Sequence, residues 1–200
     1  MEARQAFHAI TAALTTGMLA LVFFAVLTML FAGGRADRYR RLTTYADGAA
    51  TLGASLGMLF LLAALVTGFA QWPWEAYLNS PIGKNKIFTA LIALMFWAGF
   101  LWLRWKAGEQ LWRNPRLVAL STFLALGGFA YIVFTNSIGG HIAGIPSGFE
   151  RLMMEVGIET RRTFTLPAWA SALLILLGLA GIAWGVLGWP QRSRVQRSNR

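Results

Sequence analysis

The chain contains no cysteine in its 200 residues. An iron–sulfur cluster needs thiolate ligands, and covalent attachment of haem needs a Cys-x-x-Cys-His sequence, so both groups are excluded. Disulfide bonds are excluded for the same reason. A redox function would therefore require a non-covalent haem, a quinone, or a copper ion held by His and Met.

Charged residues are missing from five long apolar segments. No Asp, Glu, Lys or Arg occurs within residues 9–32, 48–72, 87–103, 117–140 and 166–189. About 20 apolar residues in a helix cross the roughly 30 Å hydrocarbon core of a bilayer. An open sheet would leave unpaired backbone groups in lipid, so the segments predict an all-α integral membrane protein with five transmembrane helices. The third segment is the shortest, and it suffices if Lys86 and Arg104 extend toward the headgroups.

The whole chain, 1–200, is accordingly expected to form a single membrane domain. The predicted parts are spans at about 9–32, 48–72, 86–105, 117–140 and 166–189, a short amphipathic helix at about 148–162, and a basic cytoplasmic tail at 190–200. Because ion-coupled transporters usually place ionisable side chains at membrane depth, their absence from the apolar segments disfavours such transport. Glycine pairs at helical spacing, Gly53 with Gly57 and Gly181 with Gly185, permit close packing of helices.

Basic residues are concentrated on one side of the five predicted spans. Twelve lie between spans one and two, between spans three and four, and in the tail: Arg35, Arg38, Arg40, Arg41, Arg104, Lys106, Arg113, Arg116, Arg192, Arg194, Arg197 and Arg200. The other side carries six: Arg4, Lys84, Lys86, Arg151, Arg161 and Arg162. Lys and Arg accumulate in cytoplasmic loops, so the N-terminus is expected outside and the C-terminus inside a bacterial inner (cytoplasmic) membrane.

The formal net charge of +10 needs no nucleic acid to explain it. The basic side of the predicted topology would face anionic lipid of the inner leaflet, which attracts such residues. The expected partners are therefore the lipid bilayer and other subunits of a membrane complex. No loop between the apolar segments contains a Gly-x-x-x-x-Gly-Lys phosphate loop or a Gly-x-Ser-x-Gly elbow, so catalysis of the type found in soluble enzymes is not expected.

Glycine and proline interrupt the sequence that follows the fourth span. Three glycines and a proline fall within eight residues at 139–146, a pattern that predicts the end of the helix and a close approach of backbone. Next, Ser147 and Glu150 are spaced as a capping box and predict the start of the amphipathic helix. Its apolar face would hold Phe149, Leu152, Met153 and Val156. That face would rest on lipid, or it would cover a cofactor.

Histidine is nearly absent, and the two histidines present, His8 and His141, lie just outside the first and fourth apolar segments. In spans that alternate in direction, both positions fall on the same membrane surface. A neutral imidazole is a good ligand for haem iron or copper. We therefore predict that His8 and His141 share one site near the outer surface, which holds a b-type haem or a bare metal ion. The alternative is that each histidine only makes hydrogen bonds at the surface.

Other residues on the same side are candidates to complete such a site. Arg4 and Arg151 could neutralise haem propionates, as could Lys84, Arg161 and Arg162. Met153 or Met154 would come near the cofactor if the amphipathic helix covers it.

Two short stretches of the chain resemble an uncharacterised family of bacterial four-helix membrane proteins, domain of unknown function 2231. That family has His-Pro-x-x-Val-His-Phe-Pro at the start of helix one and Thr-Gly-His-x-Gly-Gly at the end of helix four. Here the stretches are Phe7-His8-Ala9-Ile10 and Thr135-Asn136-Ser137-Ile138-Gly139-Gly140. The later histidine of the family falls on Ser137, its second early histidine has no counterpart near Ala13, and His141 lies one helical turn beyond Ser137. The resemblance implies a four-helix fold over about residues 6–145.

These features favour a membrane electron-transfer subunit that binds one haem b near the periplasmic face. It would relay electrons between a periplasmic cytochrome and a quinone or a larger redox complex. A cofactor-free accessory or scaffold subunit is the alternative, and it would be colourless and tolerant of substitution at both histidines. A third hypothesis, a permease for a small neutral solute, would need a polar path along Thr67, Thr89, Ser121 and Thr122.

Overall fold

The computed structural model describes residues 3–32, 38–71, 73, 75, 79–145, 147–157, 173 and 176. The chain divides into two units, Met1–Thr165 and Leu166–Arg200. All elements below belong to the first unit. The predicted fifth span at 166–189 and the tail at 190–200 lie outside the described residues, apart from Leu173 and Leu176, which are helical and exposed.

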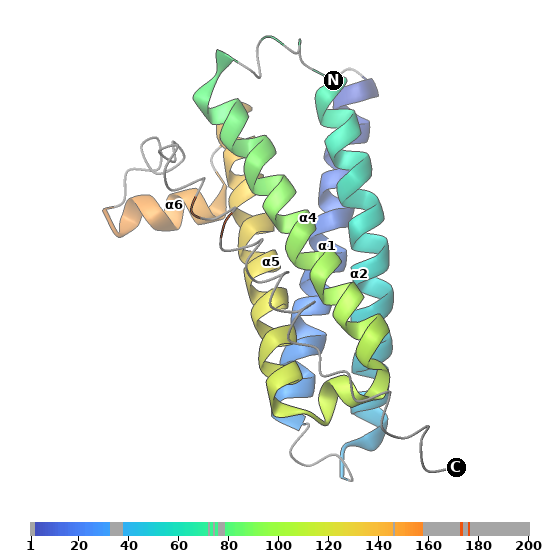
Figure 1. The fold of residues 1–200 in the computed structure, drawn as a ribbon. Coiled ribbons are helices and arrows are strands. Elements are labelled where there is room, and N and C mark those ends of the chain that lie inside the picture. The colour runs from blue at the N-terminus through green and yellow to red at the C-terminus, as the bar shows by residue number, and fades with distance from the viewer. Residues whose placement is uncertain are drawn as a thin grey trace. The chain divides into compact units, whose positions relative to one another are not determined.

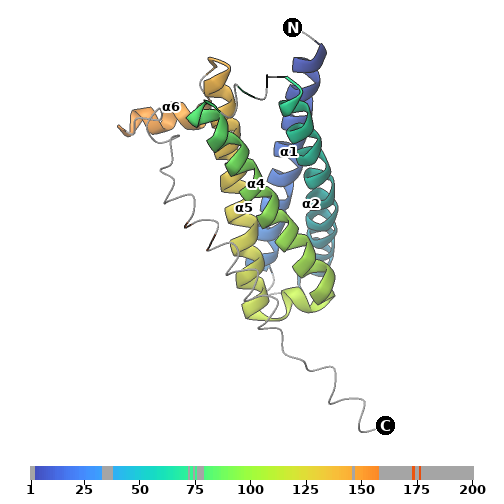
Figure 2. The same ribbon diagram turned by 45° about the horizontal axis from the view of Figure 1, so that its top comes forward.

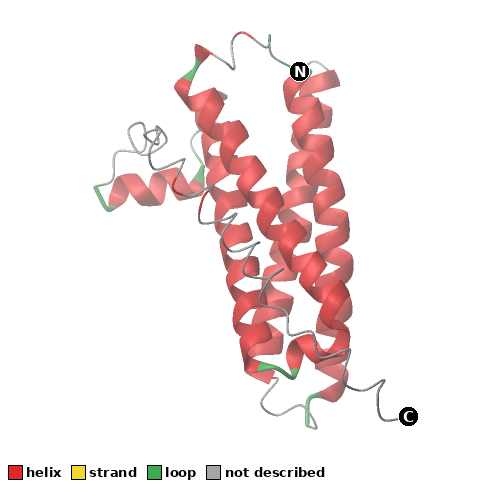
Figure 3. Ribbon diagram, in the orientation of Figure 1, coloured by secondary structure: helices red, strands yellow, loops and turns green. Residues whose placement is uncertain are grey.

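The first unit contains four long helices. They are α1 (Ala3–Ala32), α2 (Arg40–Phe69), α4 (Pro81–Ala107) and α5 (Pro115–Ile142), followed by a shorter helix, α6 (Gly148–Glu155). A 3₁₀ helix, η2 (Gly108–Trp112), joins α4 to α5. No strand occurs in the described part of the chain (Figure 3). The prediction of an all-α protein is confirmed.

The four long helices are each long and apolar enough to cross a membrane, as expected of a multi-pass membrane protein. Their outward faces are apolar: Phe24, Phe31, Leu52, Leu59 and Val66 are among many large side chains left exposed. In water such a surface would be unfavourable, whereas lipid tails solvate it well.

The helices form a bundle in which α1 packs on α2, α4 packs on α5, and the two pairs meet through α1 with α5 and α2 with α4. Successive helices alternate in direction, so the start of α1 and the end of α5 lie at the same end of the bundle (Figures 1 and 2). We call this the first end. The sequence-based expectation that His8 and His141 lie at one end is met by this arrangement.

Small residues set how closely the helices approach. A Cβ on Gly53 would lie 2.9 Å from Val22 Cγ2, and one on Gly57 would overlap Leu19, so glycine is required at both places for α2 to contact α1. Similarly, a Cβ on Gly128 would lie 2.8 Å from Trp97 Nε1. Trp97 is fully buried in the core of the bundle. The predicted close packing at Gly53 and Gly57 is thus observed, whereas Gly181 and Gly185 lie outside the described residues.

The helix ends follow from local sequence signals. Pro81 and Pro115 open α4 and α5, and the caps Ser80 and Asn114 accept hydrogen bonds from backbone N–H groups at 3.2 and 3.0 Å. The helices are longer than the charge-free segments because the first and last turns tolerate polar residues. Asp47, Lys86 and Arg104 therefore lie within helices that are long enough to span the membrane.

The fourth helix ends within the stretch 139–146, as its glycines and proline predict. Gly139 and Gly140 are themselves helical, and α5 runs on to Ile142. Gly144 follows the C-cap Ala143, and its φ of 73° is accessible to glycine at little cost. Bonds from Ile145 N to Gly140 O and from Gly144 N to His141 O form a Schellman motif.

Helix α6 begins where the capping box predicts. Ser147 caps it by accepting a hydrogen bond from Glu150 N at 3.0 Å. The helix ends at Glu155 rather than at 162, and residues 158–162 are not among those described. It runs crosswise to the end of α5 (Figure 1), and Phe149 packs edge-on against Phe134.

Candidate functional site

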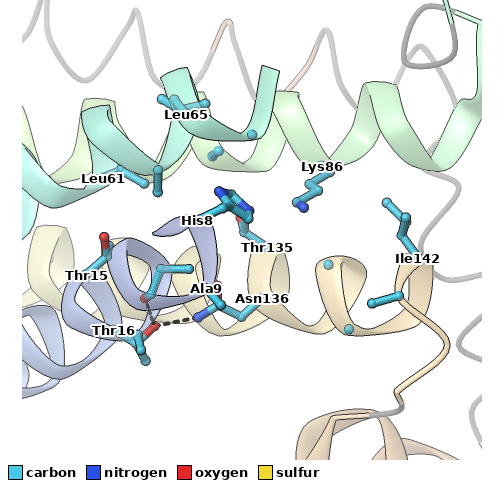
Figure 4. Close-up of a pocket in the computed structure, with 18 of the residues that line it drawn as sticks. His8, Ala9, Thr15, Thr16, Leu61, Leu65, Lys86, Thr135, Asn136 and Ile142 are labelled. Atoms are coloured by element: carbon cyan, nitrogen blue, oxygen red, sulfur yellow. Dashed lines mark hydrogen bonds between the residues drawn. The ribbon is translucent and has the colours of Figure 1, made fainter. Parts of the chain in front are cut away.

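A cavity of about 960 Å³ lies at the first end of the bundle (Figure 4). All four long helices line it, and most of its lining is Ala, Leu, Ile and Gly. The polar side chains in the lining are those of Gln5, His8, Thr15, Thr16, Gln71, Lys86, Thr135 and Asn136. Pockets for cofactors and drug-sized ligands usually measure about 300–1,000 Å³ and combine an apolar wall with a few polar groups. The cavity has the size and lining of a cofactor site.

His8 reaches the cavity from the second turn of α1. Its Nδ1 lies 3.1 Å from Thr67 Oγ1 on α2. The Thr67 hydroxyl has one hydrogen, which it donates to the backbone of its own helix at Ala63 O, 2.8 Å away. Thr67 therefore accepts the bond from His8, and in the neutral imidazole Nδ1 carries the hydrogen. This tautomer leaves the lone pair on His8 Nε2.

Gly68 makes room for the imidazole ring. A Cβ at this position would lie 3.2 Å from His8 Cε1, a tight contact that would require the ring to shift by a few tenths of an ångström. The Thr67-Gly68 pair on α2 thus supplies both a hydrogen-bond partner and space for His8.

Other polar contacts join the helices around the cavity. Asn136 on α5 donates to Thr16 Oγ1 on α1 at 2.6 Å, as Figure 4 shows. Thr135 Oγ1 lies within hydrogen-bond distance of Thr89 Oγ1, at 2.9 Å, and therefore links α5 to α4. These bonds connect α5 to α1 and α4, which are three of the helices that line the cavity.

His141 does not line the cavity that His8 lines. Its Nδ1 lies 2.7 Å from Oε1 of Glu150 on α6, and the Glu150 side chain is only 5% exposed. Helix geometry explains why the His141 side chain points away from the cavity. Asn136, Gly139 and Ala143 share the face of α5 that lines the cavity. His141 follows Gly139 by two residues, which corresponds to a rotation of about 200° around the helix axis.

Ser137 shares the face of α5 that bears His141. It is buried, and Ser147 donates a hydrogen bond to its hydroxyl at 2.9 Å. Ser137 and His141 therefore hold α6 against the end of α5. A separation of four residues puts both side chains on one helix face, and this face meets α6 rather than the cavity.

The other predicted site residues also lie away from the cavity lining. Arg4 and Arg151 are exposed, and the Arg4 carbonyl accepts a bond from Gln71 Nε2 at 3.1 Å. Met153 is half-buried on α6, and Met154 is exposed. Lys84 is exposed, and Arg161 and Arg162 lie outside the described residues. The residues of the permease hypothesis, Thr67, Thr89, Ser121 and Thr122, do not line the cavity either.

A separate polar cluster lies at the opposite end of the bundle. Arg104 donates two bonds to Asp47, from Nε to Oδ1 at 2.7 Å and from Nη2 to Oδ2 at 2.5 Å, and Trp112 Nε1 donates to Oδ1 at 2.7 Å. Arg104 thus turns toward α2 rather than to the headgroups, contrary to expectation. The cluster joins α2, α4 and η2 and has a structural role.

Within the described ranges, no group of three or more His, Asp and Glu side chains is close enough to hold a metal ion. The described residues instead offer one imidazole nitrogen, His8 Nε2, and one primary amine, Lys86 Nζ, at a largely apolar cavity. A nitrogen with a free lone pair can bind iron or accept a proton, and an amine can bind an anion or donate hydrogen bonds.

Sequence reasoning missed Lys86 and Thr67 as parts of the site. The structure shows that Lys86 lies on the inner face of α4, in line with the buried residues Ala90, Ala93 and Trp97. The sequence gives no signal for this direction, because α4 is apolar on nearly all sides. For Thr67 no local signal identifies the partner, because its bond to His8 joins residues 59 positions apart.

The chain matches no known protein family, no curated protein and no solved structure. The resemblance of the stretches around His8 and Gly139 to the four-helix family of unknown function therefore stays a prediction.

Proposed function

We propose that the protein is an electron-transfer subunit of a membrane complex and that it binds one haem b in the cavity through His8. The observation that carries the proposal is the hydrogen bond from His8 Nδ1 to Thr67 in a cavity of about 960 Å³. Histidines that bind metals almost always donate their other N–H to a neighbouring acceptor, which fixes the tautomer and the ring orientation. His8 has this arrangement.

The residues of the cavity suit a haem in three respects. His8 Nε2 supplies a nitrogen ligand, the Ala, Leu and Ile side chains suit an apolar macrocycle, and Lys86 supplies a cation for a carboxylate. Bound haem would supply one-electron chemistry. The chain's own contribution would be to hold the iron through His8, to tune its potential through the Thr67 bond, and to limit access of water. His141 bonds Glu150 outside the cavity lining, so the proposal does not include it as the second ligand.

The proposed topology has five spans, with the N-terminus outside and the C-terminus inside the bacterial inner membrane. The distribution of basic residues supports it, since Arg40, Arg41, Lys106, Arg113 and Arg116 all lie at the end of the bundle opposite the cavity. In this topology the cavity faces the periplasm. Electrons would then pass between a periplasmic cytochrome and a quinone or a larger redox complex.

Absorption spectroscopy of the purified protein tests the proposal. In detergent, the wild-type protein should show Soret and α bands in its reduced-minus-oxidised spectrum, and His8→Ala should lose them. His141→Ala is the matched control and should keep them. A colourless wild-type protein, or bands that survive His8→Ala, would refute the proposal, and the former would favour a cofactor-free accessory subunit.

A further inference from the structure

Lys86 is a cation on the inner face of a helix long enough to span the membrane. It lies in the second turn of α4, on the same stripe as the buried residues Ala90, Ala93 and Trp97. Figure 4 shows its side chain extending from α4 into the space that His8 enters from α1. The side chain lies beside α5 in the lining of the cavity.

The opposite helix leaves room for the amine. A Cβ on Gly139 of α5 would lie 3.3 Å from Lys86 Nζ, so the missing side chain lets the amine occupy this position. Any larger residue at Gly139 would displace the amine from its place beside α5.

No carboxylate of the described residues pairs with Lys86. The acidic residues in ion pairs there are Asp47, Glu109 and Glu150, and their partners are Arg104, Arg113 and His141. The cavity lining contains no Asp or Glu, and its other polar side chains are uncharged or, for His8, a neutral imidazole.

A charged group at such a place is costly unless an opposite charge accompanies it. Ionisable residues inside membrane segments commonly mark a binding site for this reason. A ligand with a negative charge would supply the compensation that the described residues do not. The apolar wall of the cavity requires that the rest of the ligand be apolar.

We infer that the cavity takes an apolar ligand that carries a carboxylate, and that Lys86 Nζ binds this carboxylate. The inference deepens the proposed function and rests on it only in part, because haem b carries propionate carboxylates whereas a fatty acid offers the same group on a different apolar body. Lys86 would orient the ligand, and His8 would bind the iron if the ligand is haem.

The test compares acids with their esters, using the full chain purified without haem in detergent micelles. One arm titrates haemin against haemin dimethyl ester and follows the Soret band. The other arm titrates spin-labelled stearic acid against its methyl ester and follows the immobilised fraction by electron paramagnetic resonance. Each arm uses the wild type, Lys86→Met, Lys86→Arg and the matched control Lys84→Met, whose native lysine is exposed two residues away on α4.

In at least one arm the wild type and Lys84→Met should bind the acid about tenfold more tightly than the ester, the gain expected of a charge-assisted hydrogen bond. Lys86→Met should bind both forms alike, and Lys86→Arg should retain part of the preference. If Lys86→Met still develops the Soret band when haemin is added, the binding of iron by His8 does not depend on the binding of the carboxylate by Lys86.

The two proposals fail in different ways. A protein that binds no haemin but prefers stearic acid in a manner dependent on Lys86 refutes the haem proposal and supports a fatty acid as the carboxylate ligand. A wild type that prefers neither acid to its ester overturns the inference about Lys86, whether or not it binds haemin, and this result does not depend on how well the variants fold.

Discussion

His8 Nδ1 on α1 and Thr67 Oγ1 on α2 lie 3.1 Å apart across the interface between two helices. The shortest contact of Thr67 Oγ1 is with Ala63 O, at 2.8 Å, and donation of its hydrogen there assigns His8 as the donor of the bond to Thr67. One contact therefore determines which imidazole nitrogen is available to a ligand. The His8 residue itself lines the cavity.

Replacing Thr67 by Val should weaken ligand binding without removing it. The substitution keeps the shape of the side chain but deletes the acceptor for His8 Nδ1–H, so the ring loses its fixed tautomer and orientation. Loss of such a partner typically lowers affinity about 10- to 100-fold. We expect a fall of about tenfold in the affinity for haemin, measured by titration of the Soret band.

Thr44→Val is the matched control for Thr67→Val. Thr44 is exposed on the same helix and donates only to Arg40 O at 2.9 Å. It should bind haemin as the wild type does. Equal affinities for Thr67→Val and the wild type would show that the Thr67 contact does not prepare His8 as a ligand.

The Asp47–Arg104 pair should stabilise the end of the bundle opposite the cavity. Both side chains are only 19% exposed, and Asp47 accepts three hydrogen bonds. Asp47→Ala would leave Arg104 without its counter-charge, so we expect a loss of about 2 kcal/mol in the free energy of unfolding. Thermal unfolding followed by circular dichroism in detergent measures the effect.

Glu109→Ala provides the comparison for Asp47→Ala. Glu109 pairs with Arg113 at 3.9 Å, and both side chains are more than four-fifths exposed. Exposed pairs contribute little, so this variant should differ from the wild type by less than about 0.5 kcal/mol. Similar losses in the two variants would mean that the Asp47 cluster has no special structural role.

The His141–Glu150 contact should hold α6 against α5. His141→Ala removes a bond of 2.7 Å to a carboxylate that is almost fully buried. Backbone amides of α6 should then exchange with solvent about tenfold faster, because a hydrogen bond to a charged group is worth about 1.5–3 kcal/mol. Hydrogen exchange read by mass spectrometry reports this change.

Arg151→Ala, on the exposed side of α6, should leave the exchange of the α6 amides unchanged. The account of α6 docking is wrong if His141→Ala and Arg151→Ala behave alike. Neither variant should alter the cavity, since neither residue lines it.

The absence of cysteine makes the topology directly testable. Single cysteines introduced as Ala3→Cys, Arg113→Cys and Ser198→Cys would be the only thiols in each variant. On intact spheroplasts an impermeant maleimide should label only the first, since the proposed topology puts the other two inside. Labelling of both Ala3→Cys and Ser198→Cys would indicate an even number of spans, and labelling of Arg113→Cys without Ala3→Cys would indicate the opposite orientation.

The general architecture follows from the sequence because charge-free segments of this length have few alternatives in lipid. Four of the predicted spans correspond to α1, α2, α4 and α5, and Ser147 caps α6 as its spacing with Glu150 predicts. The ends of the helices were harder to predict. By composition we expect helix ends at Lys86 and at the pair Gly139 and Gly140. Lys86 instead lies inside α4, where packing keeps it helical. The two glycines lie inside α5, which continues to the Schellman motif at Gly144.

The site was predicted less well than the fold, because the position of a residue along a helix does not determine the direction in which its side chain points. His8 and His141 lie at one end of the bundle, as expected, yet His141 faces α6 and His8 faces the cavity. The sequence does not show that Asn136, Gly139 and Ala143 line the cavity, so it does not give the direction of His141. The contact of His8 with Thr67 could not be predicted either, because it depends on how α1 and α2 align.

The central claim is that His8 Nε2 binds haem iron, and chemical rescue of His8→Gly tests it most directly. Removal of the side chain leaves space where free imidazole can take its place as a ligand. The account predicts that purified His8→Gly lacks the Soret and α bands of the wild type when loaded with haemin, and that added imidazole restores them, whereas His141→Gly needs no rescue. Wild-type bands in His8→Gly without imidazole would contradict the claim, as would a wild type that binds no haem.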